Sequence, residues 1–213
     1  MDLDQLPDHV VYSPNVIEFV TVAAETCLFM EHVTEFSLND FVRKSVQLLP
    51  FLYLKASMLE IPEPVFDDLP ERFVTEEDYQ FIREQTQQLL GSADSYLEVF
   101  HPDIALSDTP IAAFVSEDLA DIYQELKDFA ANYQLADVDI MNDALTACLV
   151  AFTQHWGQKL LNALRALHAV RYSDDFELQA EETLLNENHP SIDRNSFLQF
   201  LKDDDNDELN NLL

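Results

Sequence analysis

Glycine is almost missing from this sequence, since Gly91 and Gly157 are the only two in 213 residues. A glycine-rich loop that cradles phosphate groups needs several glycines close together, and none can be built here. The serine-nucleophile turn G-x-S-x-G is also missing. Apolar residues recur at helical rather than alternating spacing across most of the chain, so the scarcity of glycine accompanies an expected helical fold.

Cysteine is equally scarce. Cys27 and Cys148 are the only two, and both lie within helical apolar patterns, so we expect two buried, reduced thiols rather than a disulfide. Neither sits in the exposed, electropositive surroundings that activate a cysteine nucleophile. The zinc motifs C-x-x-C and H-E-x-x-H do not occur. Only Glu98 and His101 have the Glu-x-x-His spacing of a di-metal bundle, and Pro102 ends that helix, so we expect no metal and no other cofactor.

Long hydrophobic runs are missing as well. No stretch of about 18 apolar residues exists, so no transmembrane helix and no membrane partner are expected. The first ten residues, MDLDQLPDHV, carry acids where a secretory signal peptide has basic charge followed by an apolar stretch. Together with the reduced thiols, these features predict a cytoplasmic protein.

Basic residues are also scarce. The chain has 11 Lys and Arg against 41 Asp and Glu, which gives a formal charge of −30. The excess is not confined to one end, because residues 173–213 hold 12 acids and 2 bases while residues 1–172 hold 29 and 9. Such a field repels phosphate backbones and anionic lipids, so direct nucleic-acid binding is not expected. A basic protein partner is compatible with it, and so is the simpler explanation that the charge maintains solubility.

Hydrophobic residues, by contrast, make up 47% of the chain, which is enough for a folded core. Their spacing predicts an all-α, single-domain helical bundle of five or six helices over residues 1–172, followed by an acidic, flexible tail over 173–213. Within this tail, residues 196–201 could form a short amphipathic helix.

Capping residues predict where the first helices begin. Ser13 with Pro14 starts a helix over about 15–32, and Ser37 starts a second that Pro50 should kink or split. Thr75 with Asp78 forms a capping box for a third. Prolines 62, 64 and 70 indicate a loop before it, a short amphipathic segment is expected around 95–100, and 101–110 are expected to be loop.

The fourth helix, expected after Ser116, has an apolar stripe opposite a row of acids. Like charges at this spacing repel by some tenths of a kcal/mol per pair. A solvated face is the usual explanation for such a row, and a surface for a cation or a basic partner is the alternative. The row consists of Asp118, Asp121, Glu125 and Asp128.

The fifth helix is expected to begin near Asp137 or Asp139 and to run to about 172, roughly 50 Å long at about 1.5 Å per residue. It is either the spine of the bundle or is bent or broken at Gly157. His155, Lys159 and Asn162 form a polar stripe on it. A histidine beside a core tryptophan is most often only a hydrogen-bonded boundary residue, and the alternative is a pocket where His155, Arg165 or His168 meets acids of the fourth helix.

Four stretches are similar to a known family: EFVTVAAETCLFME, LLPFLYLKASML, SEDLADIYQELKDF and HWGQKLLNALRALH. Their combination resembles a bacterial, all-helical domain-of-unknown-function family over most of residues 10–172. The resemblance implies an all-helical cytoplasmic bacterial protein, with no activity or ligand to transfer.

These observations favour a non-enzymatic interaction or adapter protein that presents an acidic surface to a basic partner. One alternative is a helical enzyme or a small-ligand or metal binder, and another is a protein mimic of nucleic acid. Convergence of the histidines and arginine with the acids in a recess would favour the ligand alternative. The candidate binding residues of that pocket are Asp118, Asp121, Glu125, His155, Trp156, Arg165 and His168.

Overall fold

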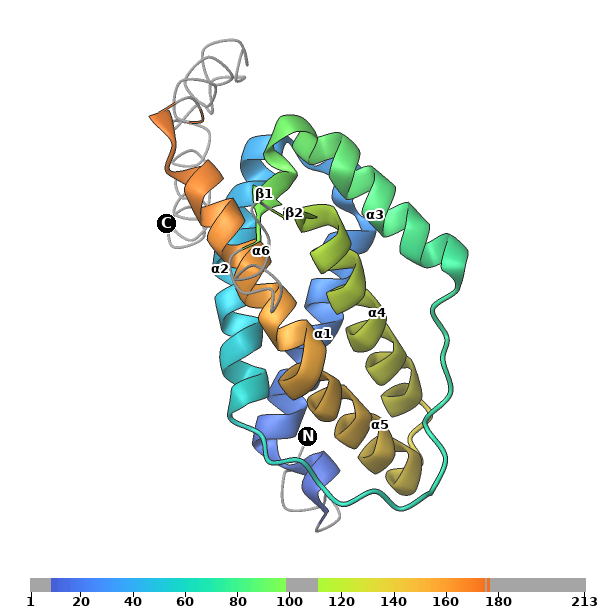
Figure 1. Cartoon of the computed structure of the whole chain (residues 1–213). Helices are drawn as coiled ribbons and strands as arrows, with labels where there is room; N and C mark the ends of the chain where they lie inside the picture. Colours follow the sequence, from blue (N-terminus) through green and yellow to red (C-terminus); the bar gives the residue numbers. More distant parts are fainter. Residues whose placement is uncertain (1–8, 99–110, 175, 177–213) are drawn as a thin grey trace, which may run out of the picture. The chain divides into compact units, whose positions relative to one another are not determined.

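In the computed structural model, which describes residues 9–98, 111–174 and 176, helices pack side by side around one apolar core (Figure 1). The all-α prediction is therefore confirmed. Helix α1 spans Pro14–Glu31, and the Ser13 hydroxyl accepts the Val16 N–H at its start, as the sequence predicted. None of the described helices is long and apolar enough to cross a membrane.

Helix α2 spans Leu38–Ser57 and begins, as predicted, at Ser37. The expectation that Pro50 splits it is wrong, because α2 continues through this residue. Pro50 is exposed, so water can hydrogen-bond the carbonyl that its missing N–H leaves unpaired. Leu49 and Leu52, both fully buried, hold the helix against the core on either side.

Helix α3 spans Glu76–Leu90 and has the complete capping box that was predicted between Thr75 and Asp78. It ends at Gly91, whose φ of 54° lies in the region that other residues rarely adopt. The connection from α2 to α3, residues 59–75, has no regular secondary structure, as its prolines predicted. We call this segment the strap, and Figure 1 shows it running past α5 and α4.

A two-stranded antiparallel hairpin, which the sequence analysis missed, follows α3. Strand β1 (Ser95–Leu97) pairs with β2 (Ala112–Phe114), so the amphipathic segment expected around 95–100 is in part a strand. Residues 101–110, expected to be loop, lie outside the described residues. Ser116 was expected to precede the fourth helix, but it lies in its first turn, and Asp94 accepts both its N–H (2.7 Å) and its hydroxyl (2.9 Å).

The fourth predicted helix is α4 (Val115–Gln134), and the fifth is one helical path in three parts. These are α5 (Val138–Ala151), a π-helical turn (Phe152–Trp156) and α6 (Gly157–Arg171), with Asp137 capping the start. Gly157 does not break the path. A Cβ there would lie 2.5 Å from the Phe152 carbonyl oxygen, so the turn leaves no space for a side chain.

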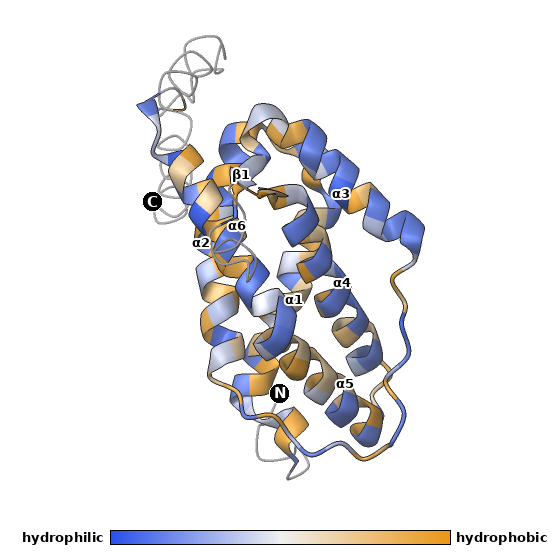
Figure 2. Ribbon diagram, in the orientation of Figure 1, coloured by the Kyte–Doolittle hydropathy of each residue, from blue (hydrophilic) through white to orange (hydrophobic). Residues whose placement is uncertain are grey.

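Helix α4 lies against α1, α3, α5 and α6, which makes it the centre of the bundle. The helices turn their apolar sides inward and their polar sides outward (Figure 2). Phe19 of α1 stacks on Phe129 of α4, with ring centroids 5.3 Å apart. Cys27 and Cys148 are both buried and free, so the prediction of buried thiols is confirmed. The predicted helix at 196–201 and the predicted flexible tail lie outside the described residues.

Candidate functional site

The row of acids on α4 is not the solvated face that its spacing suggested. Asp118 is 5% exposed, and Asp121, Glu125 and Asp128 are only partly exposed. The cause is tertiary: because α4 is surrounded by neighbours, the side opposite its main apolar stripe is covered too. A carboxylate that is buried needs an ion pair or a hydrogen bond within the fold.

Lys159 of α6 reaches the first two acids of the row. Its Nζ atom lies 2.6 Å from Asp121 Oδ2 and 3.4 Å from Asp118 Oδ1. Two tyrosines from other elements complete the group: Tyr79 of α3 donates to Asp121 at 2.9 Å, and Tyr96 of β1 donates to Asp118 at 2.5 Å. We call these five residues the Lys159 cluster. It joins α3, β1, α4 and α6.

The cluster perturbs the proton affinities of its members. Burial raises the pKa of Asp118 to about 6, although the Tyr96 hydroxyl and Lys159 both act to lower it. Burial lowers the pKa of Lys159, but its hydrogen bond to Asp121 and the charges of both aspartates leave that pKa raised. The pKa values of Tyr79 and Tyr96 are raised by burial and by their carboxylate partners. Asp118 is thus the member that can change its protonation near neutral pH.

A pocket of about 360 Å³ lies beside the cluster. It is bordered by β2, by the start of α4, and by the π turn with the first part of α6. Among its lining residues, Asp118 belongs to α4, His155 to the π turn and Lys159 to α6. Two further lining residues are hydrogen-bonded to each other, since Asn162 donates to Glu98 at 3.0 Å. Eight of the pocket's eleven lining residues are polar or charged, and its π turn is a feature that often marks functional sites.

The structure brings together only part of the predicted site. His155 is exposed and shares the pocket with Asp118. Arg165 is exposed and lines a neighbouring pocket of about 320 Å³, while the ring of His168 lies tilted against that of Tyr172, with centroids 4.7 Å apart. Trp156 is fully buried and donates its Nε1 hydrogen to the Cys148 carbonyl at 3.0 Å, so its role is in the core.

Sequence reasoning missed the residue that does meet the acids. Lys159 was recognised only as a member of the stripe with His155, and its place among the unusual polar residues of the fifth helix was the available signal. Tyr79 and Tyr96 gave no such signal, since they reach α4 from elements that are distant in sequence.

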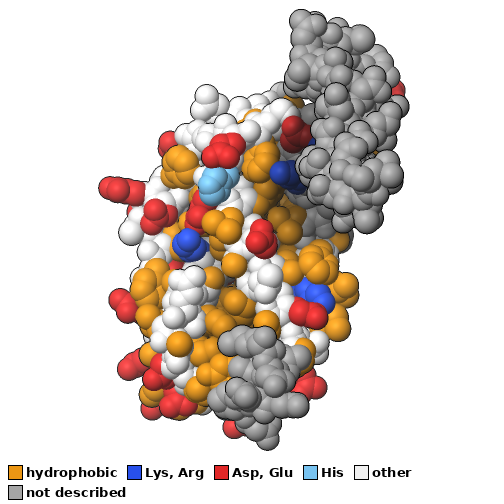
Figure 3. All heavy atoms as spheres, turned by 180° about the vertical axis from the view of Figure 1, so that it is seen from behind, with side chains coloured by type: hydrophobic (Ala, Val, Ile, Leu, Met, Phe, Trp, Pro, Cys, Tyr) orange, Lys and Arg blue, Asp and Glu red, His pale blue; other side chains and the backbone are white. Residues whose placement is uncertain are grey.

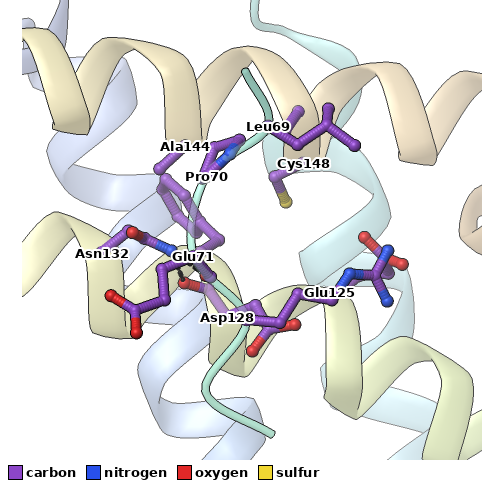
Figure 4. A pocket seen from close by; sticks show the side chains of 11 residues that line it. Leu69, Pro70, Glu71, Glu125, Asp128, Asn132, Ala144 and Cys148 are labelled. Carbon is purple, nitrogen blue, oxygen red and sulfur yellow. Dashed lines mark hydrogen bonds between the residues drawn. The ribbon is translucent and has the colours of Figure 1, made fainter.

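The later acids of the row lie beneath the strap. Asp128 accepts the N–H groups of Phe73 (2.7 Å) and Val74 (2.9 Å). One helical turn on, the Asn132 side chain donates to the Glu71 carbonyl at 2.8 Å. Figure 4 shows the strap crossing between α4 and α5. Residues of the strap, α4 and α5 line a small cavity there, with a volume of about 60 Å³. Glu125 also lines it; burial raises its pKa, and the charge of Arg72 acts against this.

Helix α5 holds the other end of the strap. Asp143 accepts the N–H groups of Val65 (2.7 Å) and Phe66 (2.8 Å). Next to it, Asn142 donates to the Glu63 carbonyl at 2.7 Å, and the Thr146 hydroxyl donates to the Pro62 carbonyl at 3.2 Å. Burial acts to raise the pKa of Asp143, but these backbone hydrogen bonds prevail and the pKa is lowered.

The outward side of the strap combines acids with apolar side chains. Its five carboxylates are all exposed, and its only basic residue is Arg72. Leu69 is 83% exposed, and four further large apolar side chains are between 40% and 52% exposed. The acids are Glu60, Glu63, Asp67, Asp68 and Glu71, and the apolar side chains are Ile61, Val65, Phe66, Leu69 and Phe73.

A second apolar surface lies between α1 and α2. Leu28 and Phe51, each 47% exposed, line a groove of about 710 Å³ there together with Phe29 and Phe36. Viewed from the side opposite to Figure 1, the molecule shows a broad band of apolar side chains among scattered charges (Figure 3). Within the described residues, no group of three or more His, Cys, Asp or Glu side chains could hold a metal ion.

Comparison with known proteins identifies relatives without identifying an activity. The family model named Domain of unknown function (DUF5063) matches residues 10–173. The crystal structure of protein BF1032 from Bacteroides fragilis is 44% identical, covers 78% of this chain and 97% of that one, and superposes with a TM-score of 0.69. No curated protein matches. The resemblance seen in the sequence to a bacterial helical family is confirmed.

Proposed function

This chain belongs to the family Domain of unknown function (DUF5063), and we propose that it acts as a non-catalytic interaction domain whose exposed acids bind a basic protein partner. The observation that carries this proposal is the exposed, acidic and apolar side of the strap. Acidic residues with apolar anchors are a combination suited to recognising a basic segment of another protein, because charge provides attraction at long range and apolar contact provides short-range affinity.

The acids of α4 differ from those of the strap, and this difference supports the same conclusion. Asp121 and Asp128 have their carboxylates bound by Lys159 or by backbone N–H groups, so they serve the fold. The acids of the strap are exposed instead. We place the interaction in the cytoplasm, since Cys27 and Cys148 are free thiols and a reducing compartment keeps them so.

Affinity capture at two salt concentrations tests the proposal. The full chain, tagged and immobilised, is exposed to a bacterial lysate at low and at high salt, beside an unrelated acidic protein of similar size and charge. We expect a basic protein in stoichiometric amount on this chain, absent from the control and released by salt, because screening weakens exposed charge pairing. Equal retention on both supports, or no retained protein at either salt concentration, contradicts the proposal.

A small-ligand function is the second candidate, and the pocket beside the Lys159 cluster favours it. Perturbed carboxyl groups at the edge of a polar recess are typical of binding and active sites, and Asp118 fits that description. The measurement is mass analysis of small molecules released when the purified chain is denatured. A molecule released from the wild type and missing from His155→Ala, with both proteins equally folded, would support this candidate. No released molecule from the wild type would count against it.

A further inference from the structure

The strap is an irregular segment that is fastened at both ends. Loops of this length without secondary structure are uncommon in compact domains and are usually functional or disordered. Here seven hydrogen bonds from side chains of α4 and α5 hold the backbone at Pro62–Phe66 and at Glu71–Val74. Four of the five residues that make them are buried: Asn132, Asn142, Asp143 and Thr146.

Residues 67–70 lie between the two anchored stretches and are exposed or partly exposed. Asp67, Asp68 and Leu69 are exposed, and Leu69 is 83% exposed, the largest value among the exposed large apolar side chains of the described residues. An isolated exposed leucine needs no explanation by itself. Here the anchoring bonds hold the segment in which it lies, and two nearby apolar side chains, Val65 and Phe66, are about half exposed.

Resting on the interaction function proposed above, we propose that residues 60–73 of the strap form the docking surface, and that its occupant is a partner segment with an apolar residue flanked by Lys or Arg. Charge complementarity identifies this occupant. Five carboxylates and one arginine on the strap attract a cationic segment, and Leu69 with Phe66 offers the apolar contact.

The same charge argument disfavours other occupants. A second copy of this chain carries the same charge of −30 and the same acidic strap, so two straps repel each other. An anionic lipid surface is repelled in the same way. Anchoring adds to the affinity for a basic segment, because a surface that is already ordered loses less conformational entropy on binding.

Fluorescence anisotropy with three synthetic peptides of equal length tests this surface on the full chain. One peptide carries Lys, Arg and Leu, the second has Ser in place of Leu, and the third has Asp and Glu in place of Lys and Arg. We expect the basic peptide with leucine to bind most tightly and the acidic peptide not to bind. Salt should weaken the binding of both basic peptides, because the attraction is between exposed charges.

Variants locate the binding on the strap. Leu69→Ser should weaken the peptide with leucine about tenfold, which corresponds to losing the burial of one apolar side chain, and should not affect the peptide with serine. Asp67→Asn combined with Asp68→Asn should weaken both basic peptides about threefold to tenfold and flatten their salt dependence. The affected side chains are exposed, so the melting temperature of these variants should match that of the wild type.

Matched control variants carry the same changes on other surfaces. Leu97→Ser removes a leucine that is 62% exposed on β1, and Glu25→Gln with Glu35→Gln removes two exposed acids near the groove between α1 and α2. Both should bind like the wild type. If the strap variants bind like the wild type while a control variant loses binding, the strap is not the docking surface, and the acidic interaction function is retained. If neither basic peptide binds better than the acidic one, the docking surface and the charge-based function both fail.

Discussion

Asp118 and Asp143 are each 5% exposed, yet the fold moves their pKa values in opposite directions. Asp118 lies between helices and receives one tyrosine hydroxyl and a lysine at 3.4 Å, whose shorter contact is to Asp121. Asp143 lies under the strap and receives two backbone N–H groups and the amide of Asn142. At equal solvent exposure, the depth of burial and the donors together decide the charge state of a carboxyl group here.

Acidic side chains therefore have two different roles in this molecule. In the Lys159 cluster, burial raises the pKa of Asp118 and the charge of Asp121 adds a smaller increase, while Tyr96 and Lys159 act against it. The strap anchors satisfy a carboxylate with neutral donors and fasten a backbone segment that has no secondary structure of its own. Substitutions at Lys159, Asp143, Asp118 and Asp128 test this difference, with losses of stability that decrease in that order.

Lys159→Met should have the largest effect. It leaves Asp118 and Asp121 close together without their cation, and breaking a largely buried pair costs about 3 kcal/mol of unfolding free energy. Urea unfolding measures the loss. Lys55→Met is the matched control, because it breaks a surface pair with Glu18 that should contribute less than about 1 kcal/mol. Equal losses in the two variants would show that the cluster is not a buried charge network.

Asp143→Ala should cost about 2 kcal/mol, because the N–H groups of Val65 and Phe66 lose their charged acceptor. The strap should also become the first site of cleavage in limited proteolysis, which measures local opening. Asp67→Ala, on the exposed part of the same segment, should change stability by less than about 0.5 kcal/mol. A strap that stays resistant to protease in Asp143→Ala would show that this anchor does not hold it.

Asp118→Asn should change the pH dependence of stability. The pKa of Asp118 is about 6 in the folded state and about 3.9 when unfolded, so the folded state binds the proton more tightly. Its contribution to stability therefore increases as pH falls from 7 to 5, by about 1 kcal/mol, and Asn removes this increase. Urea unfolding of both proteins at the two pH values gives the difference, and identical pH slopes would contradict a raised pKa at this site.

The opposite sign applies under the strap. The pKa of Asp143 is lowered, so its stabilising contribution is present above about pH 4, its unfolded value, and is lost as pH falls through the folded value. Proteolytic opening of the strap should thus increase only under acidic conditions, with an acid-stable protease as the probe.

Asp128→Asn should have the smallest effect, about 0.5 to 1 kcal/mol, because its bond to Phe73 is exposed and one amide oxygen still accepts a hydrogen bond. Unfolding in urea compares it with Asp143→Ala. A loss as large as that of Asp143→Ala would mean that burial does not distinguish the two anchors.

Much of the fold was accessible from local sequence. The capping residues Ser13, Ser37 and Thr75 begin helices where predicted, because a cap and its N–H partner lie within three residues of each other. Pro50 misled the prediction because the strength of packing on either side of it is not visible locally. The hairpin was missed because its three-residue strands are too short for a periodic pattern.

The candidate site could be predicted from the sequence only in part. The sequence alone determined that α4 carries a row of acids, that the fifth helix carries unusual polar residues and that the chain is strongly acidic. Only the tertiary structure decided that Lys159 meets this row, that Asp143 and Asp128 hold the strap, and that the strap's own acids stay exposed. The reason is physical: periodicity assigns residues to the faces of one helix, whereas burial and pairing depend on which distant element covers each face.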